Sequence, residues 1–137
     1  MKWDSSFAIG IKAIDDQHQK IFGHLLAIEN ALLKRDPWNI VRFHLGQLAD
    51  YMKFHFAVEE ALLEIIGYPH RADHVGSHFR LTEQIAELEK QLQKVGPDES
   101  LVTFFEKWFI GHVLSSDREY AAYVREQFPA LYRQPSK

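Results

Sequence analysis

The chain has 137 residues, of which 46% are hydrophobic and 26% charged, and this suits one globular domain with a sizeable core. A formal net charge of -3 gives no basic field for nucleic acid or anionic lipid, so neither is an expected partner. The chain contains no cysteine, which excludes disulfides, thiolate metal sites and cysteine nucleophiles and leaves nitrogen and oxygen to hold any metal.

The N-terminal stretch lacks the long apolar segment of a signal peptide. No uninterrupted apolar run approaches the roughly 18 residues of a membrane-spanning helix. We therefore expect a cytoplasmic protein.

Helix-breaking residues at Pro37, 67–69, 96–97 and Pro129 divide the sequence into four long segments with helical spacing. The first segment runs from about residue 15 to 34, and we expect Asp15 or Asp16 to cap it. Its apolar positions and one histidine recur every three or four residues. They are Ile14, His18, Ile21, Leu25, Ile28 and Leu32.

The second segment opens with Asp36 and Pro37, a hydrogen-bond acceptor followed by a ring suited to the first helical position, and continues to about residue 66. The third runs from about 69 to 95 and the fourth from about 98 to 127. The inner positions of these segments are Val41, Leu45, Leu48, Tyr51, Met52, His55, Glu59 and Leu62, then His74, His78, Leu81, Ile85, Leu88 and Leu92, then Leu101, Phe104, Phe105, Trp108 and His112.

Short connections between long amphipathic segments favour antiparallel neighbours. The sequence therefore predicts an all-α, up-down-up-down four-helix bundle over residues 15–127. Residues 1–14, with Trp3 and Phe7, are expected to form an N-terminal arm packed across the bundle, and residues 128–137 a C-terminal tail. Residues 1–137 would thus be a single domain.

Histidines recur on the inner face of all four segments. His55 and Glu59 are four residues apart, as are His74 and His78, a spacing that stacks two side chains on one face of a helix. Single histidines are usually core or surface residues, and His24, His44 and His70 fit that description. A buried cluster of imidazoles without a metal would leave many polar atoms unsatisfied. The pattern therefore favours a shared metal site over a metal-free bundle.

Asp117 follows His112 by five residues, and an ideal α-helix turns about 140° away from the first face over that interval. For both side chains to reach one site, the fourth helix must widen or kink between them, for example as a π-bulge. Gly111, Ser115 and Ser116 lie where such a distortion can be accommodated.

These residues closely resemble the hemerythrin family in its single-domain bacterial form. The motifs that carry the resemblance are IDDQH ending at His18, HFAVEE from His55, GYP from Gly67, HVGSH from His74 and WFIGHVLSSDREY from Trp108. The resemblance covers nearly the whole chain. It implies a four-helix bundle around a non-haem di-iron centre (Fe2+/Fe3+) with an oxo or hydroxo bridge, which binds dioxygen.

Transferred position by position, the resemblance implies a ligand set divided three to two. His74, His78 and His112 would hold one iron. His18 and His55 would hold the other. Glu59 and Asp117 would bridge the two ions. If both are octahedral, this division leaves one vacant position, on the iron held by His18 and His55.

The resemblance also implies an apolar oxygen pocket over the open iron, lined by Ile21, Phe56, Trp108, Phe109 and Val113. An apolar wall keeps out water and anions that promote loss of the bound oxygen. Phe109 stands where the family usually has leucine, and its ring is expected to narrow the pocket, block it or gate entry. Leu63 replaces a common methionine.

We interpret the chain as a reversible dioxygen-binding protein, a carrier, store or supplier rather than an enzyme. Carboxylate-rich di-iron enzymes use Glu-x-x-His motifs, and no histidine here follows a glutamate by three residues. The alternatives are a signalling module that reports oxygen or redox state to a protein partner, and a repair protein that handles iron or nitric oxide. The donor set also suits zinc or manganese.

Overall fold

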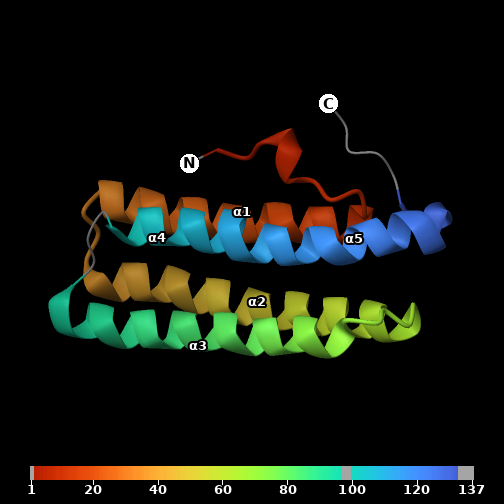
Figure 1. Ribbon diagram of the computed structural model, residues 1–137. Helices are drawn as coiled ribbons and strands as arrows, with labels where there is room; N and C mark the ends of the chain where they lie inside the picture. Colours follow the sequence, from red (N-terminus) through yellow and green to blue (C-terminus); the bar gives the residue numbers. More distant parts are fainter. Residues whose placement is uncertain (1, 97–99, 133–137) are drawn as a thin grey trace.

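Four long helical rods lie side by side in the computed structural model, which describes residues 2–96 and 100–132 (Figure 1). The first three are α1 (Lys12–Leu33), α2 (Trp38–Ile65) and α3 (Arg71–Val95). The fourth consists of α4 (Ser100–Trp108), the π-helix η2 (Phe109–Leu114) and α5 (Ser115–Gln127). Short 3-10 turns, η1 (Ser5–Phe7) and η3 (Pro129–Leu131), lie near the ends of the chain.

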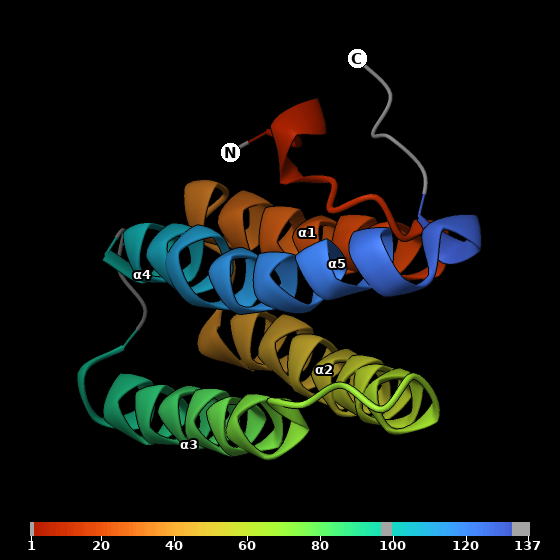
Figure 2. The same ribbon diagram turned by 45° about the vertical axis from the view of Figure 1, so that its right-hand side comes forward.

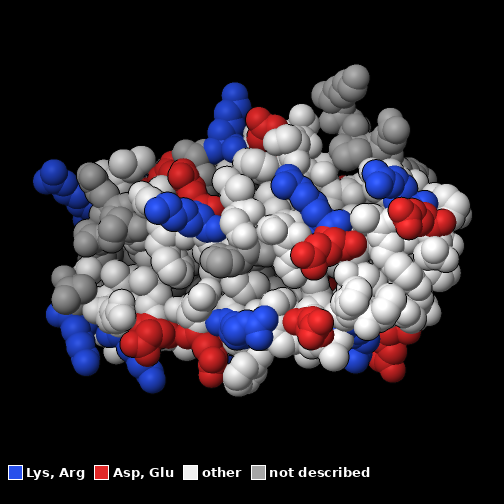
Figure 3. Space-filling view, in the orientation of Figure 1, with Lys and Arg blue, Asp and Glu red and all other residues white. Residues whose placement is uncertain are grey.

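The rods form two layers, with α1 beside α4 and α5 in one and α2 beside α3 in the other (Figures 1 and 2). Consecutive rods run in opposite directions, so the predicted antiparallel bundle is confirmed. Within the described residues no helix is long and apolar enough to cross a membrane. Acidic and basic side chains are interspersed over the face in Figure 3, and the described residues form no continuous basic surface there.

The predicted cap of the first helix is wrong. The helix begins at Lys12, three residues before the expected start, and its cap residue Ile11 makes no side-chain hydrogen bond. Asp15 instead lies in the first turn, where its carboxylate accepts hydrogen bonds from the backbone N–H groups of Ile9 at 2.7 Å and Gly10 at 3.1 Å. Gly10 has a φ of 96°, a turn that glycine adopts without strain and that brings these groups to the carboxylate.

The expected start of the second helix is also wrong by one residue. Pro37 is the cap residue rather than the first helical residue, and no side chain caps α2. Asp36 belongs to the C-terminal end of α1, because its backbone N–H donates a hydrogen bond to the carbonyl of Ala31 at 2.9 Å. The third helix begins at Arg71 rather than at Pro69. The expected start of the fourth segment, at 98, lies outside the described residues.

Two apolar clusters lie along the bundle on either side of a layer of buried polar residues. The larger includes Ile21, Leu48 and Phe105, and the smaller includes Ile14, Leu63 and Tyr120. The predicted inner face of α2 is slightly rotated: Tyr51 and Leu62 are half-buried, whereas Phe56 and Leu63 are buried. The polar layer thus has apolar packing above and below it.

The N-terminal arm packs across the layer of α1 and the fourth rod, as expected (Figure 1). The Trp3 ring lies edge-on to Phe7 and Phe22, with centroids 5.4 and 5.8 Å away. Phe7 in turn contacts Phe109, at 6.2 Å. The Arg118 guanidinium donates to the backbone carbonyl of Ser6 at 2.7 Å, which ties the arm to α5. The arm is therefore attached by both aromatic packing and hydrogen bonds.

Replacing Asp15 with alanine is expected to loosen the arm, because the N–H groups of Ile9 and Gly10 lose their acceptor. The free energy of unfolding should fall by about 1–2 kcal/mol, as is usual when charge-assisted hydrogen bonds are removed. Urea denaturation measures this loss, and amide hydrogen exchange should accelerate at both residues. Asp16→Ala is the matched control, since Asp16 is exposed and only pairs with Lys12. Equal effects of the two substitutions would contradict the role of Asp15.

Candidate metal centre

The polar layer receives side chains from every rod of the bundle. His18 comes from α1, His55 and Glu59 from α2, His74 and His78 from α3, and Asp117 from α5. None of the six is more than 5% exposed. Buried ionisable groups are rare without partners, so the position of six in one layer indicates a site rather than ordinary core.

The six residues form two overlapping groups of possible metal ligands. One group is His18, His55, Glu59 and Asp117, and the other is Glu59, His74, His78 and Asp117. Within each group the donor atoms lie within 4.8 Å of one another. The two carboxylates belong to both groups, so each lies between the two sets of imidazoles.

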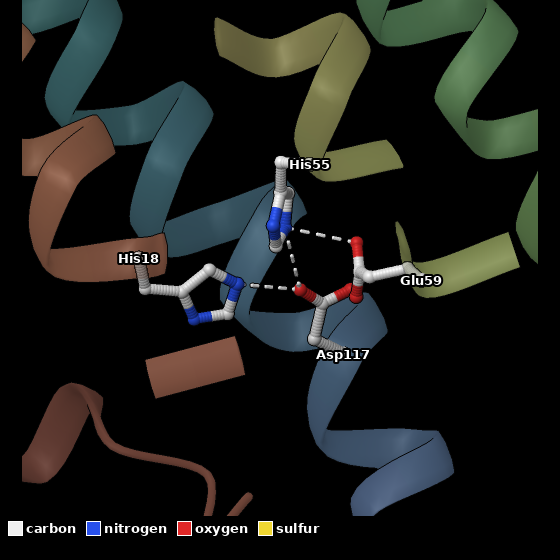
Figure 4. Close-up of side chains that lie close together, drawn as sticks. All are labelled: His18, His55, Glu59 and Asp117. Carbon is white, nitrogen blue, oxygen red and sulfur yellow. Dashed lines mark hydrogen bonds and ion pairs between the residues drawn. The ribbon is translucent and has the colours of Figure 1, made fainter. Parts of the chain in front are cut away.

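The contacts within the site are short, but most are poorly directed for hydrogen bonding. The Nε2 atom of His55 lies 2.9 Å from Oε1 of Glu59, and that of His78 lies 3.3 Å from the same oxygen. His18 Nε2, by contrast, makes a hydrogen bond of 2.7 Å to Oδ2 of Asp117 (Figure 4).

Five buried atoms of these six residues therefore have no hydrogen-bond partner within the described residues. They are His18 Nδ1, His55 Nε2, Glu59 Oε1, His74 Nε2 and His78 Nε2. Buried polar atoms without partners are costly and need an explanation. These are the atoms through which imidazoles and carboxylates bind metals, and together they fit a nitrogen and oxygen ligand set.

The charges of the site perturb its pKa values strongly. Burial alone would lower the pKa of His55, but the charges and contacts of Glu59 and Asp117 together outweigh it and raise that pKa to about 9. Burial also opposes protonation of His74, but its contacts with Asp117 and Glu59 raise the pKa to about 9. Burial would raise the pKa of Glu59, yet the positive charge of His55 and the contacts of Glu59 with His55, His74 and His78 together hold it well below its usual range. Without metal, protons on the imidazoles therefore balance the carboxylates.

Three imidazoles have neighbours for the ring nitrogen that faces away from the centre. The Nδ1 atom of His55 lies 2.7 Å from Oε1 of Gln17, and that of His74 lies 3.1 Å from the hydroxyl of Ser116. The Nδ1 atom of His78 lies 3.4 Å from the carboxylate of Glu60, which is half-buried. Such contacts fix the orientation and tautomer of metal-binding histidines. Sequence reasoning missed the contact of Gln17 and that of Ser116.

Tyr120 was also missed as a residue of the site. Its hydroxyl donates a hydrogen bond of 2.6 Å to Oε2 of Glu59, and both side chains are buried. Burial, together with the charge of Glu59, raises the pKa of Tyr120 well above its usual value, so the phenol keeps its proton and remains a donor. A buried tyrosine needs a polar partner for its hydroxyl. Because Tyr120 follows Asp117 by three residues on one helix face, the sequence could have placed its hydroxyl near the carboxylates.

The predicted widening of the fourth helix is confirmed. The π-helix covers Phe109–Leu114, starting three residues before His112, and the following helix directs the Asp117 carboxylate into the centre. A π-turn pairs residues five apart, which corrects the angular mismatch of an α-helix. The backbone of His112 lies in this turn, but its side chain is outside the described part of the structure, so its role as a ligand stays a prediction.

The other histidines lie away from the centre. His24 is half-buried against Tyr51, with ring centroids 5.5 Å apart, and His44 lies beside Phe43. His70 is exposed before α3. None of the three joins a ligand group within the described residues.

The two sides of the centre differ in character. Ile21, Phe56, Trp108, Phe109 and Val113, the predicted pocket residues, are all buried in the larger apolar cluster. Phe109 lies edge-on to His18 at 5.8 Å, whereas Phe56 stacks on His78 at 3.9 Å. On the other side, a cavity of about 580 Å³ borders His74 and is lined by polar groups that include those of Ser77, Ser116 and Glu119. The centre therefore has one apolar side and one polar side.

Comparisons with known proteins agree on one family. The family model of the hemerythrin HHE cation binding domain matches residues 9–124. Bacteriohemerythrin from Stenotrophomonas maltophilia (strain R551-3) is 29% identical over 137 residues, covering 96% of this chain and 86% of that protein. A hemerythrin-like protein from Naegleria gruberi is 30% identical and covers 86% of this chain and 88% of its own. The crystal structure of wild-type hemerythrin aligns with a TM-score of 0.78 at 25% identity, over 89% of this chain and 95% of that chain.

Loading the metal-free protein with iron(II) is expected to release protons. His55 and His74, with pKa values of about 9, carry protons at about pH 7.5, and a metal binds only neutral imidazole. Roughly two protons per protein should appear in weakly buffered solution containing an indicator dye. Because protons compete with the metal below pH 9, the apparent affinity should rise with pH up to that value. His24→Gln should leave the yield unchanged, and no release near neutral pH would refute the predicted protonation of the site.

Proposed function

Because this chain belongs to the hemerythrin family, we propose that it binds dioxygen reversibly at a non-haem di-iron centre and acts as an oxygen carrier, store or supplier. The observation that carries the proposal is the pair of ligand groups that share Glu59 and Asp117. Two ions held side by side need ligands common to both, and a carboxylate has one oxygen for each.

The proposed ligand roles follow these groups. His18 and His55 hold one iron, and His74 and His78, with His112, hold the other, while Glu59 and Asp117 bridge the two ions. When bound, the iron pair supplies reversible exchange of electrons with dioxygen. A ligand set with more imidazoles than carboxylates adds little negative charge, which favours binding over the high oxidation states that attack substrates.

The chain's own residues set the conditions for binding. The Tyr120 hydroxyl and the Gln17 side chain hold Glu59 and His55 in place, so the ligands do not reorganise when the charge of the centre changes. The buried ring of Phe109, edge-on to His18, excludes water from the apolar side. These features support reversible binding because water and anions promote loss of bound oxygen.

A signalling role is the second candidate, favoured by one observation. The arm is linked to the site through ring contacts from Phe7 to Phe109, at 6.2 Å, and from Phe109 to His18, at 5.8 Å. A shift of His18 on ligand binding would be transmitted to the arm through these packed rings.

The carrier proposal is tested by the visible spectrum of the iron-loaded, reduced protein. Exposure to air should produce a ligand-to-metal charge-transfer band, and inert gas should remove it over repeated cycles. A featureless spectrum from a protein containing two irons would refute reversible oxygen binding.

Two variants at neighbouring residues test the proposed bridging role of Glu59. Glu59→Ala should cost much of the bound iron and the charge-transfer band, because a shared ligand and its charge are lost together. Glu60→Ala should retain most of the iron, since the Glu60 carboxylate belongs to neither ligand group and supports His78 from its outer nitrogen, at 3.4 Å. Metal analysis after gel filtration distinguishes the two, and full iron retention by Glu59→Ala would contradict the bridging role.

Phe109→Leu is expected to speed small-ligand exchange, because a branched aliphatic side chain replaces a ring that contacts His18, Phe7 and Phe22. Stopped-flow binding of azide to the oxidised protein should accelerate by roughly tenfold or more if the ring gates access. Phe105→Leu, a buried ring in the same apolar cluster, controls for loosened packing. Unchanged rates for Phe109→Leu would show that this ring does not limit access.

A further inference from the structure

The outward face of α2 carries a stripe of exposed apolar side chains. Phe43 is 59% exposed, Phe54 54% and Ile65 83%. They are spaced eleven residues apart, which is close to three turns of a helix of ~3.6 residues per turn, so they fall on one line along the helix. Residues 45, 52, 56 and 63 of the same helix are buried on its opposite side. The stripe therefore faces away from the bundle.

The positions between these three residues are small or polar. Ala57 and Ala61 are small and exposed, Gln47 and Asp50 are polar, and exposed Lys53 flanks Phe54. Large exposed apolar side chains aligned on one face of a helix often mark an interaction site. A helix face with large residues at regular intervals and small residues between them suits packing against another helix.

We propose that this stripe pairs with the same stripe of a second copy of the chain, antiparallel, across a two-fold axis at Phe54. The spacing of the stripe is symmetric about that residue. Phe43 and Ile65 lie eleven residues on either side of it, and Gln47 and Ala61 lie seven. In the pair Phe43 meets the partner's Ile65, and Phe54 meets the partner's Phe54. A two-fold interface requires such a self-complementary surface.

One pair of flanking charges is complementary in the same orientation. Arg42 lies at one end of the stripe and Glu64 at the other, and antiparallel pairing brings Arg42 beside the partner's Glu64 at both ends. Within the chain their ion pairs are long and exposed, 3.6 Å from Arg42 to Glu89 and 3.8 Å from Glu64 to Arg71, so both side chains can turn to a new partner. Asp50 and the partner's Asp50 are separated by about 12 Å measured along the helix axis. Lys53 lies about 3 Å along the helix from the partner's Lys53, so these two side chains must extend away from each other. A parallel pair would instead place every charge beside its own copy.

The dimer is expected to be weak and concentration-dependent. The stripe from Phe43 to Ile65 is about 33 Å long but only one helix wide, a contact at the lower end of the range for specific interfaces. Sedimentation of the iron-loaded protein should show a monomer–dimer equilibrium. Phe54→Glu should weaken it by roughly tenfold or more, because it places two like charges on the axis. Leu33→Glu, at an exposed apolar residue of α1, should leave the equilibrium unchanged.

Because the chain has no cysteine, single introduced cysteines can report the geometry. Phe54→Cys should form a disulfide-linked dimer under mild oxidation, since only a residue near the two-fold axis meets its own copy. Phe43→Cys and Ile65→Cys should cross-link poorly alone and efficiently when mixed. In an antiparallel pair, Phe43 lies about 33 Å from the partner's Phe43, far beyond disulfide reach.

Charge reversal provides an independent check. Arg42→Glu and Glu64→Arg should each weaken association, and the double variant should restore it. A monomer at all concentrations up to about 1 mM would overturn the proposal. So would cross-linking of Phe43→Cys with itself, which indicates a parallel pair, or equal effects of Phe54→Glu and Leu33→Glu, which indicate non-specific association. Iron content of the variants separates these outcomes from any failure of the metal site.

Discussion

Two carboxylates buried side by side are the constraint on which the rest of the structure depends. Glu59 and Asp117 are 0% and 2% exposed, and two negative charges cannot remain in such a place without positive charge beside them. The imidazoles supply that charge as protons in the metal-free protein, and bound cations would supply it in the loaded one. The polar layer is therefore electrostatically balanced in either state. Apolar clusters above and below exclude water and strengthen each interaction within it.

The balance depends on residues that bind no metal. Tyr120 donates to Glu59, Gln17 contacts His55, and Ser116 contacts His74, so carboxylate and imidazoles are held from outside the centre. All four rods supply candidate ligands, and two of them, α1 and the fourth rod, also supply these three supporting side chains. Movement of one helix would break a ligand contact and a supporting contact at once. This arrangement joins the packing of the bundle to the geometry of the site.

The bundle and the positions of the ligands on its inner faces could be predicted from sequence because both follow from helical periodicity. The π-helix was predictable for the same reason, since Asp117 departs from the periodicity of the fourth segment. The supporting contacts were not, because they join residues 38, 42 and 61 positions apart and depend on how the helices are rotated against each other. The helix starts at Lys12 and Trp38 were missed because the Asp15 carboxylate accepts from backbone N–H groups of the arm, and because the backbone N–H of Asp36 bonds to the end of the preceding helix. The side chain of His112 lies outside the described residues, so its place in the ligand set remains a prediction.

The π-helix makes the number of residues in the last rod as important as their identity. A return of Phe109–Leu114 to α-helical form at unchanged length would rotate everything after it by about 100°. Asp117 would then leave the polar layer, and Tyr120 and Val124 would leave the core in the same step. Removing one residue between His112 and Asp117 has the opposite effect, because the two positions would then be four residues apart and share one face of an ordinary α-helix. The last rod therefore tolerates a shorter segment here, at the cost of the π-turn, but not a longer one.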